Sequence, residues 1–226
     1  VYKGEILALL GENGSGKTTL MNMLSGIYFP DEGEIRINGE LVKISSPKDA
    51  YHYHIGMIHQ HFKLIEAFNS VENIVLGIKP SVSFWEKCKY FFTNFYKKKE
   101  NRAERKLDES SPKDAKKKVQ EICDKYGFQL DLNKKVYDMS VSEKQTLEIV
   151  KSIYRGADIL ILDEPTAVLT PIESERLFSV IRNMKKDGKS IIIITHKMNE
   201  VLSVSDRVAV LRKGECIGDV LTKNAN

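Results

Sequence analysis

The glycine-rich segment at residues 11–19, GENGSGKTT, has the spacing G-x-x-x-x-G-K-[ST] of a phosphate-binding loop. Glycines let backbone N–H groups turn inward around phosphate oxygens, and a helix that follows adds partial positive charge at its start. In this pattern Lys17 reaches the β- and γ-phosphates, and Thr18 offers its hydroxyl to Mg²⁺. The segment therefore predicts a nucleotide site. Its loop residues are Gly11, Asn13, Gly14, Ser15, Gly16, Lys17, Thr18 and Thr19.

Two acidic residues, Asp163 and Glu164, end the apolar segment DILILDEP at 158–165. In open parallel sheets, ligands bind at the carboxyl ends of the strands. Asp163 is placed to support Mg²⁺ there, and Glu164 to polarise the water that attacks a γ-phosphate. A solvated acidic turn is the alternative interpretation, and the nearby phosphate-binding loop favours the catalytic one.

Gln60 and His196 each follow a predicted strand, HIGMIHQ at 54–60 and SIIIIT at 190–195. A single histidine is more often structural than catalytic, and a single glutamine at a strand end is unremarkable. Both, however, lie where a buried strand would end at the same edge of the sheet. They are therefore candidate site residues.

The elements that must position these side chains alternate along the chain. The predicted strands are 5–10, 54–60, 158–165 and 190–195. The predicted helices are 17–26, 112–126, 141–155 and 170–188. Hairpins are expected at 33–44, turning at Asn38-Gly39, and at 206–220, turning at Lys213-Gly214. Strands that alternate with helices predict an α/β fold with a mostly parallel sheet.

The stretch 65–156 interrupts this alternation. It is mostly helical, so we predict that it forms a helical subdomain inserted into the α/β core. Within it, SVSEKQ at 140–145 predicts a helix start, because Ser140 and Glu143 have the spacing of a capping box. The segment SSPKDA, at 45–50 and again at 110–115, likewise predicts two helix starts with a serine cap and proline in the first turn.

An aromatic and lysine-rich insertion is predicted at 78–111. Seven of the chain's 19 aromatic residues lie within 84–96, and lysines follow them. Such a segment suits an interfacial helix on an anionic membrane. We favour an ordinary helix that packs on the subdomain, because most amphipathic helices pack on protein.

Composition excludes several classes of protein. The 226-residue chain carries a formal net charge of +4. Residues 79–118 hold 13 Lys and Arg against 6 Asp and Glu, whereas the rest holds 22 against 25. A general nucleic-acid surface is therefore not expected. No run approaches the ~18 apolar residues of a membrane span. No N/T-K-x-D string indicates a GTPase.

The ends of the chain and its cysteines add two expectations. The chain begins with Val1 and runs straight into the EILALL strand, so we expect an N-terminally truncated fragment without a signal peptide. Three cysteines without a CxxC pair (Cys88, Cys123 and Cys216) are typical of free thiols in a reducing cytosol.

The order of these motifs resembles the ATP-binding subunits of ABC transporters. Lys17, Gln60, SVSEKQ, ILILDEP and His196 correspond to the Walker A loop, Q-loop, signature motif, Walker B motif and switch histidine. The resemblance covers nearly the whole chain. The segments GMIHQHF and EIVKSIYRGADILILDEPTAVLTP most resemble those of the branch that serves simple-sugar and nucleoside importers. That branch often fuses two such modules, and this chain resembles the first.

The resemblance implies a P-loop NTPase core with an inserted helical subdomain and peripheral β-hairpins, so that residues 1–226 form a single nucleotide-binding domain. Two such domains meet head to tail around two ATP molecules, each held by the Walker loop of one domain and the signature motif of the other. The implied signature contacts are Ser140, Ser142 and Gln145. The implied catalytic residues are Glu164, His196 and Gln60, and the implied Mg²⁺ residues are Thr18, Gln60 and Asp163.

The implied function is hydrolysis of ATP to power import of a sugar or nucleoside. The partners would be a second nucleotide-binding domain and a membrane permease. The domain would be located at the cytoplasmic face of the membrane. Two alternatives stay open: a module that binds ATP but is impaired in hydrolysis, and a non-transport ABC ATPase. The confined basic charge disfavours the second.

Three departures from the family pattern bear on the first alternative. Ser142 replaces the signature glycine, and Thr146 replaces the arginine that commonly follows the motif. The aromatic residue that normally stacks on adenine lies upstream of the Walker loop, and we expect this chain to begin too late to include it. Tyr2, fifteen residues before Lys17, is too near to substitute for it.

Overall fold

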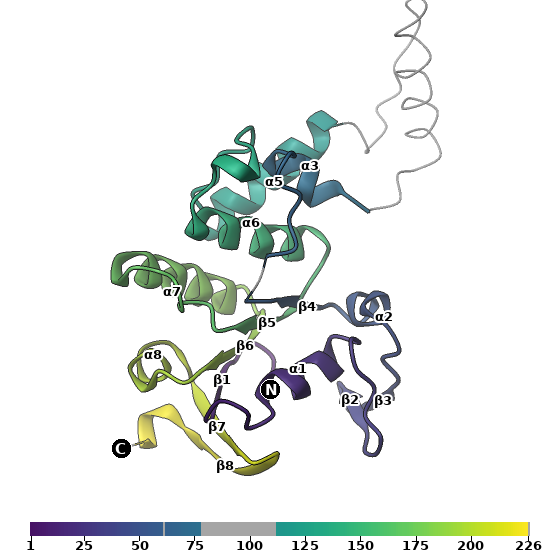
Figure 1. The fold of residues 1–226 in the computed structure, drawn as a ribbon, viewed down its shortest axis with the longest axis vertical. Helices are drawn as coiled ribbons and strands as arrows, with labels where there is room; N and C mark the ends of the chain where they lie inside the picture. The colour runs from purple at the N-terminus through teal and green to yellow at the C-terminus, as the bar shows by residue number, and fades with distance from the viewer. Residues whose placement is uncertain (61, 78–111, 226) are drawn as a thin grey trace, which may run out of the picture.

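A six-stranded sheet lies at the centre of the fold in the computed structural model, which describes residues 1–60, 62–77 and 112–225 (Figure 1). Its order is β4-β5-β6-β1-β7-β8. The strands are β1 (Ile6–Leu10), β4 (Ile55–Ile58), β5 (Ile159–Asp163), β6 (Ser190–Thr195), β7 (Arg207–Arg212) and β8 (Glu215–Leu221). All neighbours are parallel except β7 and β8. The predicted α/β fold with a mostly parallel sheet is confirmed.

The side chains of the central strands divide between two hydrophobic layers. Successive residues of a strand point to opposite faces of a sheet. Leu160 and Leu162 of β5 therefore join a core with residues of the helices α6 (Val141–Tyr154) and α7 (Pro171–Lys186). Ile161, between them, packs on the other face with Met21 of the helix α1. Burial on both faces explains why these strands read as continuous apolar runs.

Helices cover both faces of the sheet (Figure 1). They are α1 (Lys17–Leu24), α2 (Pro47–His52), α3 (Ser70–Val75), α5 (Pro112–Tyr126), α6 (Val141–Tyr154), α7 (Pro171–Lys186) and α8 (Met198–Val204), with 3₁₀ turns at Val136–Asp138 and Thr222–Asn224. The predicted capping box of Ser140 and Glu143 starts α6, and a second one, of Thr170 and Glu173, starts α7. Ser46 caps α2 as predicted. Ser111, before α5, lies outside the described residues.

The structure differs from the sequence prediction at the second hairpin. The turn at Lys213 and Gly214 is confirmed, with φ angles of 50° and 85°. However, this hairpin is part of the main sheet, because β7 pairs in parallel with β1 and β8 is the edge strand beside β7. The first hairpin, β2 (Ile35–Ile37) with β3 (Glu40–Val42), forms a separate two-stranded sheet.

The described part of 65–156 contains α3, α5 and α6, which pack together above the sheet (Figure 1). Leu147 and Ile149 of α6 share one core with Leu160 of β5. A boundary between a helical subdomain and the sheet stays a prediction. The 78–111 insertion and its expected helix lie outside the described residues. Among the helices that are described, none has the length and hydropathy needed to cross a bilayer.

Gly26 provides a test of packing where α1 meets α2. Its φ is +72°, and a Cβ there would lie 2.3 Å from the carbonyl oxygen of Ser46. Gly77 has a similar φ of +77° but open space around it. A left-handed φ costs an alanine ~1–2 kcal/mol, and overpacking adds ~1–3 kcal/mol. We expect Gly26→Ala to lower the free energy of unfolding in urea by about 2–5 kcal/mol and Gly77→Ala by only about 1–2 kcal/mol. Equal losses would contradict this account of the packing.

Candidate functional site

The phosphate-binding loop connects the carboxyl end of β1 to the start of α1. Gly16 immediately precedes the helix with a left-handed φ of 97°, which favours glycine. Lys17 is only 6% exposed, and its ammonium donates hydrogen bonds to the carbonyl oxygens of Gly11 (2.8 Å) and Glu12 (2.9 Å). An ammonium has three donors. Lys17 therefore braces the loop and keeps a donor for a phosphate oxygen.

The start of α1 is suited to an anion. The first N–H groups of a helix have no partner within the helix, so those of Lys17, Thr18 and Thr19 are available at the loop. The first turn of α1 carries no acidic residue that would compete for them. Together with the helix dipole, this geometry favours a bound phosphate.

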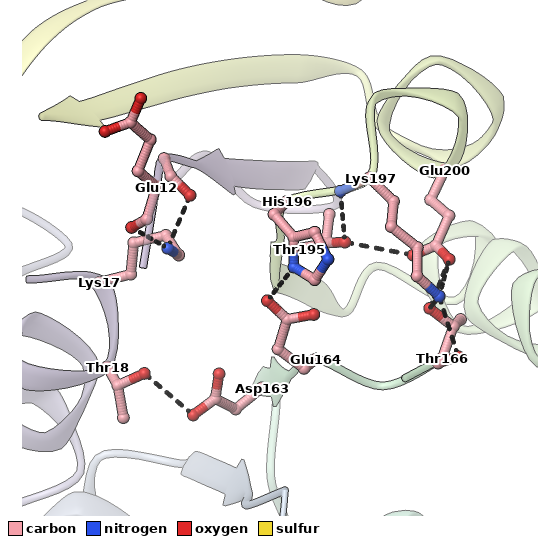
Figure 2. A network of polar contacts seen from close by, with 11 residues as sticks. Glu12, Lys17, Thr18, Asp163, Glu164, Thr166, Thr195, His196, Lys197 and Glu200 are labelled. Carbon is pink, nitrogen blue, oxygen red and sulfur yellow. Dashed lines mark hydrogen bonds and ion pairs between the residues drawn. The ribbon is translucent and has the colours of Figure 1, made fainter. Parts of the chain in front are cut away.

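Thr18 and Asp163 connect the loop to the neighbouring strand β5. The hydroxyl of Thr18 donates to Oδ2 of Asp163 at 3.2 Å (Figure 2). Burial raises the pKa of Asp163, while the hydrogen bond from Thr18 opposes that rise. A buried carboxylate gains from a nearby cation, and Mg²⁺ takes oxygen ligands of these two kinds. The pair therefore fits a Mg²⁺ ion that accompanies a nucleotide.

Glu164 and His196 form the second polar pair. Nδ1 of His196 lies 2.9 Å from Oε1 of Glu164 (Figure 2). The glutamate side chain is 15% exposed and the imidazole 54% exposed, so the pair lies at the mouth of the site. The backbone of Glu164 has a φ of 48°, and its N–H donates to the carbonyl of Ile194 in β6. A left-handed backbone is uncommon for glutamate and must be held by its surroundings.

One cavity of about 470 Å³ brings most of the predicted site residues together. The predicted residues that line it are Asn13, Gly14, Gly16, Lys17, Thr18, Thr19, Gln60, Asp163, Glu164 and His196. Gly11 and Ser15 support the loop instead: Gly11 accepts from Lys17, and Ser15 is buried. The sheet topology explains the convergence, because β1, β4, β5 and β6 are parallel and all end at this edge.

The three predicted signature residues lie elsewhere. Ser140, Ser142 and Gln145 line a separate cavity of about 410 Å³, with walls that include residues of α6 and α7. Gln145 is buried, and its amide donates to the carbonyl of Pro165 at 2.6 Å. Its side chain is thus engaged within the chain, just beyond Glu164. The assignment of these three residues to a nucleotide stays a prediction.

Tyr2 lies at the end of β1 opposite the phosphate-binding loop. Its ring centroid is 4.7 Å from the guanidinium carbon of Arg207 at the start of β7. It does not line the cavity around Lys17. The expectation that Tyr2 does not substitute for an adenine-stacking residue agrees with this position.

Sequence reasoning missed a polar cluster beside Glu164 and His196. Thr166 follows Glu164 by two residues, Thr195 and Lys197 flank His196, and Glu200 lies on α8. These four side chains bond to one another (Figure 2). The only signal in the sequence was that three of these residues are close to Glu164 or His196. That signal does not predict the contact between Thr166 and Glu200, which are 34 residues apart.

Comparisons with known proteins agree with these motifs. A family model described as "ABC transporter" matches residues 1–167. The guanosine import ATP-binding protein NupO of Bacillus subtilis (strain 168) is 48% identical over 226 residues, which is all of this chain and 40% of NupO. The nucleoside import ATP-binding protein NupA of Lactococcus lactis subsp. cremoris is 46% identical over 218 residues, or 96% of this chain and 38% of NupA.

A solved structure shows a similar fold. The crystal structure of the ADP conformation of MJ1267, an ATP-binding cassette of an ABC transporter, superposes with a TM-score of 0.76 at 25% identity, covering 99% of this chain and 84% of that one. The chain spans about two fifths of the length of the curated relatives it matches.

Proposed function

The chain belongs to the ABC transporter family of ATP-binding proteins, and on that premise we propose that it binds ATP with Mg²⁺ and hydrolyses it to power solute import. The observation that supports this proposal is that one cavity brings together residues suited to three tasks. Lys17 and the N–H groups of α1 bind phosphate, Thr18 and Asp163 provide oxygen ligands, and Glu164 with His196 provides a base and its partner.

Binding is assigned to the loop and to the Mg²⁺ residues. Lys17 neutralises charge on the β- and γ-phosphates, and the N–H groups of Thr18 and Thr19 orient them. Thr18, Asp163 and Gln60 would hold Mg²⁺, which neutralises charge that develops on the phosphate oxygens. Gln60 is exposed in the loop after β4 and lines the same cavity.

Hydrolysis is assigned to Glu164 and His196. One oxygen of Glu164 faces Nδ1 of His196, which leaves the second oxygen to accept a hydrogen bond from a water. That water attacks the γ-phosphorus, the bond to the ADP oxygen breaks, and the proton of the water passes to the carboxylate or to the released phosphate. His196 keeps the carboxylate oriented through Nδ1, which leaves its other ring nitrogen to contact the phosphate.

A second copy of the domain is required to complete the site. Ser140 and Ser142, at the N-terminal end of α6, line a cavity other than the one around Lys17, so a single chain does not bring them to its own ATP. We assign them, with Gln145, to the ATP held by a second nucleotide-binding domain, in the same polypeptide or another chain. The free N–H groups of α6 would approach the γ-phosphate there.

The transported solute is assigned to the nucleoside or sugar class, because the relatives include ATP-binding proteins for the import of nucleosides, guanosine and ribose. A membrane permease would carry the solute, which places this domain at the cytoplasmic face of the membrane. Outside 79–118 the chain is mildly acidic, so no nucleic-acid partner is proposed. An ATP-binding module with impaired hydrolysis is the alternative, and Ser142 favours it.

Ser142 gives a test that separates these two functions. Ser142 lies in the first turn of α6 and lines the same cavity as Glu173 of α7. A serine Cβ at a close contact with phosphate is overpacking of ~1–3 kcal/mol, or roughly 5- to 150-fold in rate. We expect Ser142→Gly to raise the ATPase rate of the assembled pair by such a factor. ATP affinity of the isolated chain should not change.

The measurement is ATPase rate against protein concentration for both forms. A rate per molecule that rises with concentration supports the composite site, whereas a constant rate contradicts it. Equal rates for the two forms, or a slower glycine variant, would show that Ser142 is fully functional as it stands.

A further inference from the structure

A polar cluster beside the proposed catalytic pair has no role in the chemistry described so far. We call it the Glu200 cluster: Thr166, Thr195, Lys197 and Glu200. It joins three parts of the chain, namely the loop after β5, the end of β6 and the helix α8 (Figure 2). Three of its members are close in sequence to the catalytic pair, since Thr166 lies two residues after Glu164, and Thr195 and Lys197 flank His196.

One carboxylate holds both threonines. Oε1 of Glu200 accepts a hydrogen bond from the hydroxyl of Thr166 at 2.5 Å, and Oε2 accepts one from the hydroxyl of Thr195 at 3.3 Å. Both threonines are 1% exposed, and the Glu200 side chain is 13% exposed. Buried hydrogen bonds to a charged group are stronger and more directional than exposed ones. The carboxylate therefore fixes the spacing between the two segments.

Lys197 completes the cluster. Its ammonium lies 3.1 Å from Oε1 of Glu200 and donates to the carbonyl of Thr166 at 3.1 Å. Its backbone N–H donates to the hydroxyl of Thr195 at 3.1 Å. The charge of Glu200 is therefore paired within the cluster, and each hydroxyl has a defined partner.

The loop after Glu164 is held at three successive residues by three different elements. The N–H of Glu164 bonds to Ile194 of β6, the carbonyl of Pro165 accepts from Gln145 of α6, and the hydroxyl of Thr166 bonds to Glu200 of α8. A left-handed backbone at a residue such as Glu164, with φ of 48°, persists only where the surroundings over-determine it. Among these tethers, the Glu200 carboxylate is the one that bonds side chains of both segments, Thr166 in the loop and Thr195 directly before His196.

We propose that Glu200 is a positioning residue that sets the distance between the Glu164 carboxylate and the His196 imidazole, and through it the direction in which Glu164 faces the attacking water. This inference rests on the proposed ATPase function. Within the part of the chain that the structure describes, the Glu200 carboxylate bonds to Thr166, Thr195 and Lys197 and does not line the cavity around the phosphate-binding loop and the Mg²⁺ residues. Its loss should therefore lower catalysis and spare binding.

Glu200→Ala tests whether Glu200 acts on catalysis and not on ATP binding, and Glu175→Ala is the matched control. Both glutamates line the groove between α7 and α8, and Glu175 pairs with Arg182 at 2.8 Å, away from the catalytic pair. Misplacement of a catalytic group by ~1 Å can cost about 100-fold in rate. We expect Glu200→Ala to lower kcat about 10- to 100-fold, with affinity for a fluorescent ATP analogue within about twofold. Glu175→Ala should change neither.

Two substitutions at Thr166 separate positioning from packing. Thr166→Val keeps the shape of the buried side chain and removes the hydroxyl, whereas Thr166→Ser keeps the hydroxyl and removes a methyl group. If the hydrogen bond to Glu200 positions the loop, the valine variant should be slower than the serine variant. If Thr166 only fills space, the order reverses, which would overturn the proposal.

A spectroscopic measurement decides the inference even if the chain shows no ATPase activity. The imidazole ¹⁵N resonances of His196, identified by their loss in His196→Gln, report the hydrogen bond at Nδ1. In Glu200→Ala and Thr166→Val they should shift toward the values seen in Glu164→Ala, and in Glu175→Ala they should stay. Unchanged His196 resonances in a folded Glu200→Ala chain would overturn the proposal. An absent ATPase in the unmodified chain would instead count against the proposed function.

Discussion

Glu164→Gln is expected to lose most of the ATPase turnover and to keep its affinity for ATP. The amide oxygen of glutamine can still accept from Nδ1 of His196, so the geometry of the pair is retained. The substitution removes the carboxylate that accepts a proton from water. General-base contributions are typically 10²–10⁴-fold in rate, so we expect a loss of about that size.

The measurement is steady-state phosphate release by the chain at concentrations where the rate per molecule is maximal, together with ATP affinity. Because ATP would persist at the interface, the variant should also accumulate an ATP-bound dimer, which size-exclusion chromatography would detect. Glu175→Gln, which makes the same substitution on α7, is the control and should turn over normally. Near-normal turnover in the Glu164 variant would remove Glu164 from the catalytic role.

Lys17→Ala is expected to abolish measurable ATP binding. Lys17 is the cation buried in the phosphate-binding loop, and hydrogen bonds to charged groups contribute ~1.5–3 kcal/mol each. Loss of the one bond to phosphate alone predicts about a 10- to 150-fold fall in affinity, and loss of the two bonds that brace the loop adds to it. Lys17→Met, which retains most of the side-chain length, separates loss of charge from collapse of the loop.

A fluorescent ATP analogue measures the affinity of both variants, and their melting temperatures report folding. Lys185→Ala is the control, because Lys185 pairs with Asp206 away from the nucleotide cavity. If both Lys17 variants are folded and bind the analogue as tightly as the unmodified chain, the assignment of the site to this loop is wrong.

Most of the fold followed from local patterns in the sequence. β5 and β6 were predictable because their runs of isoleucine and leucine are too short for buried helices and end in turns. The starts of α6 and α7 were predictable because a capping box needs only residues three apart. α8 was missed because it has only seven residues and no side-chain cap. The end of strand 54–60 was placed two residues too late, since Gln60 belongs to the loop that lines the site.

The site was predictable in its residue types and less so in its contacts. Motif order located Lys17, Asp163 and His196, and the parallel topology explains why they converge on one cavity. The bond between Thr166 and Glu200 depends on where α8 packs against the loop after β5. No periodicity in the sequence encodes that packing, because the packing depends on the register of β5 with β6 and on the length of the connection from β6 to α8.

The position of β1 in the sheet sets an order of events during synthesis on the ribosome. Its neighbours are β6 and β7, with Ile6 opposite Ile191 and Leu7 opposite Arg207. At ~5–20 residues per second, about 10–40 s separate the emergence of the first strand from that of its partners. Such non-local pairing is slow to form. The phosphate-binding loop follows this strand directly, so we expect a nascent chain to bind ATP only after β6 and β7 have been made and paired with β1.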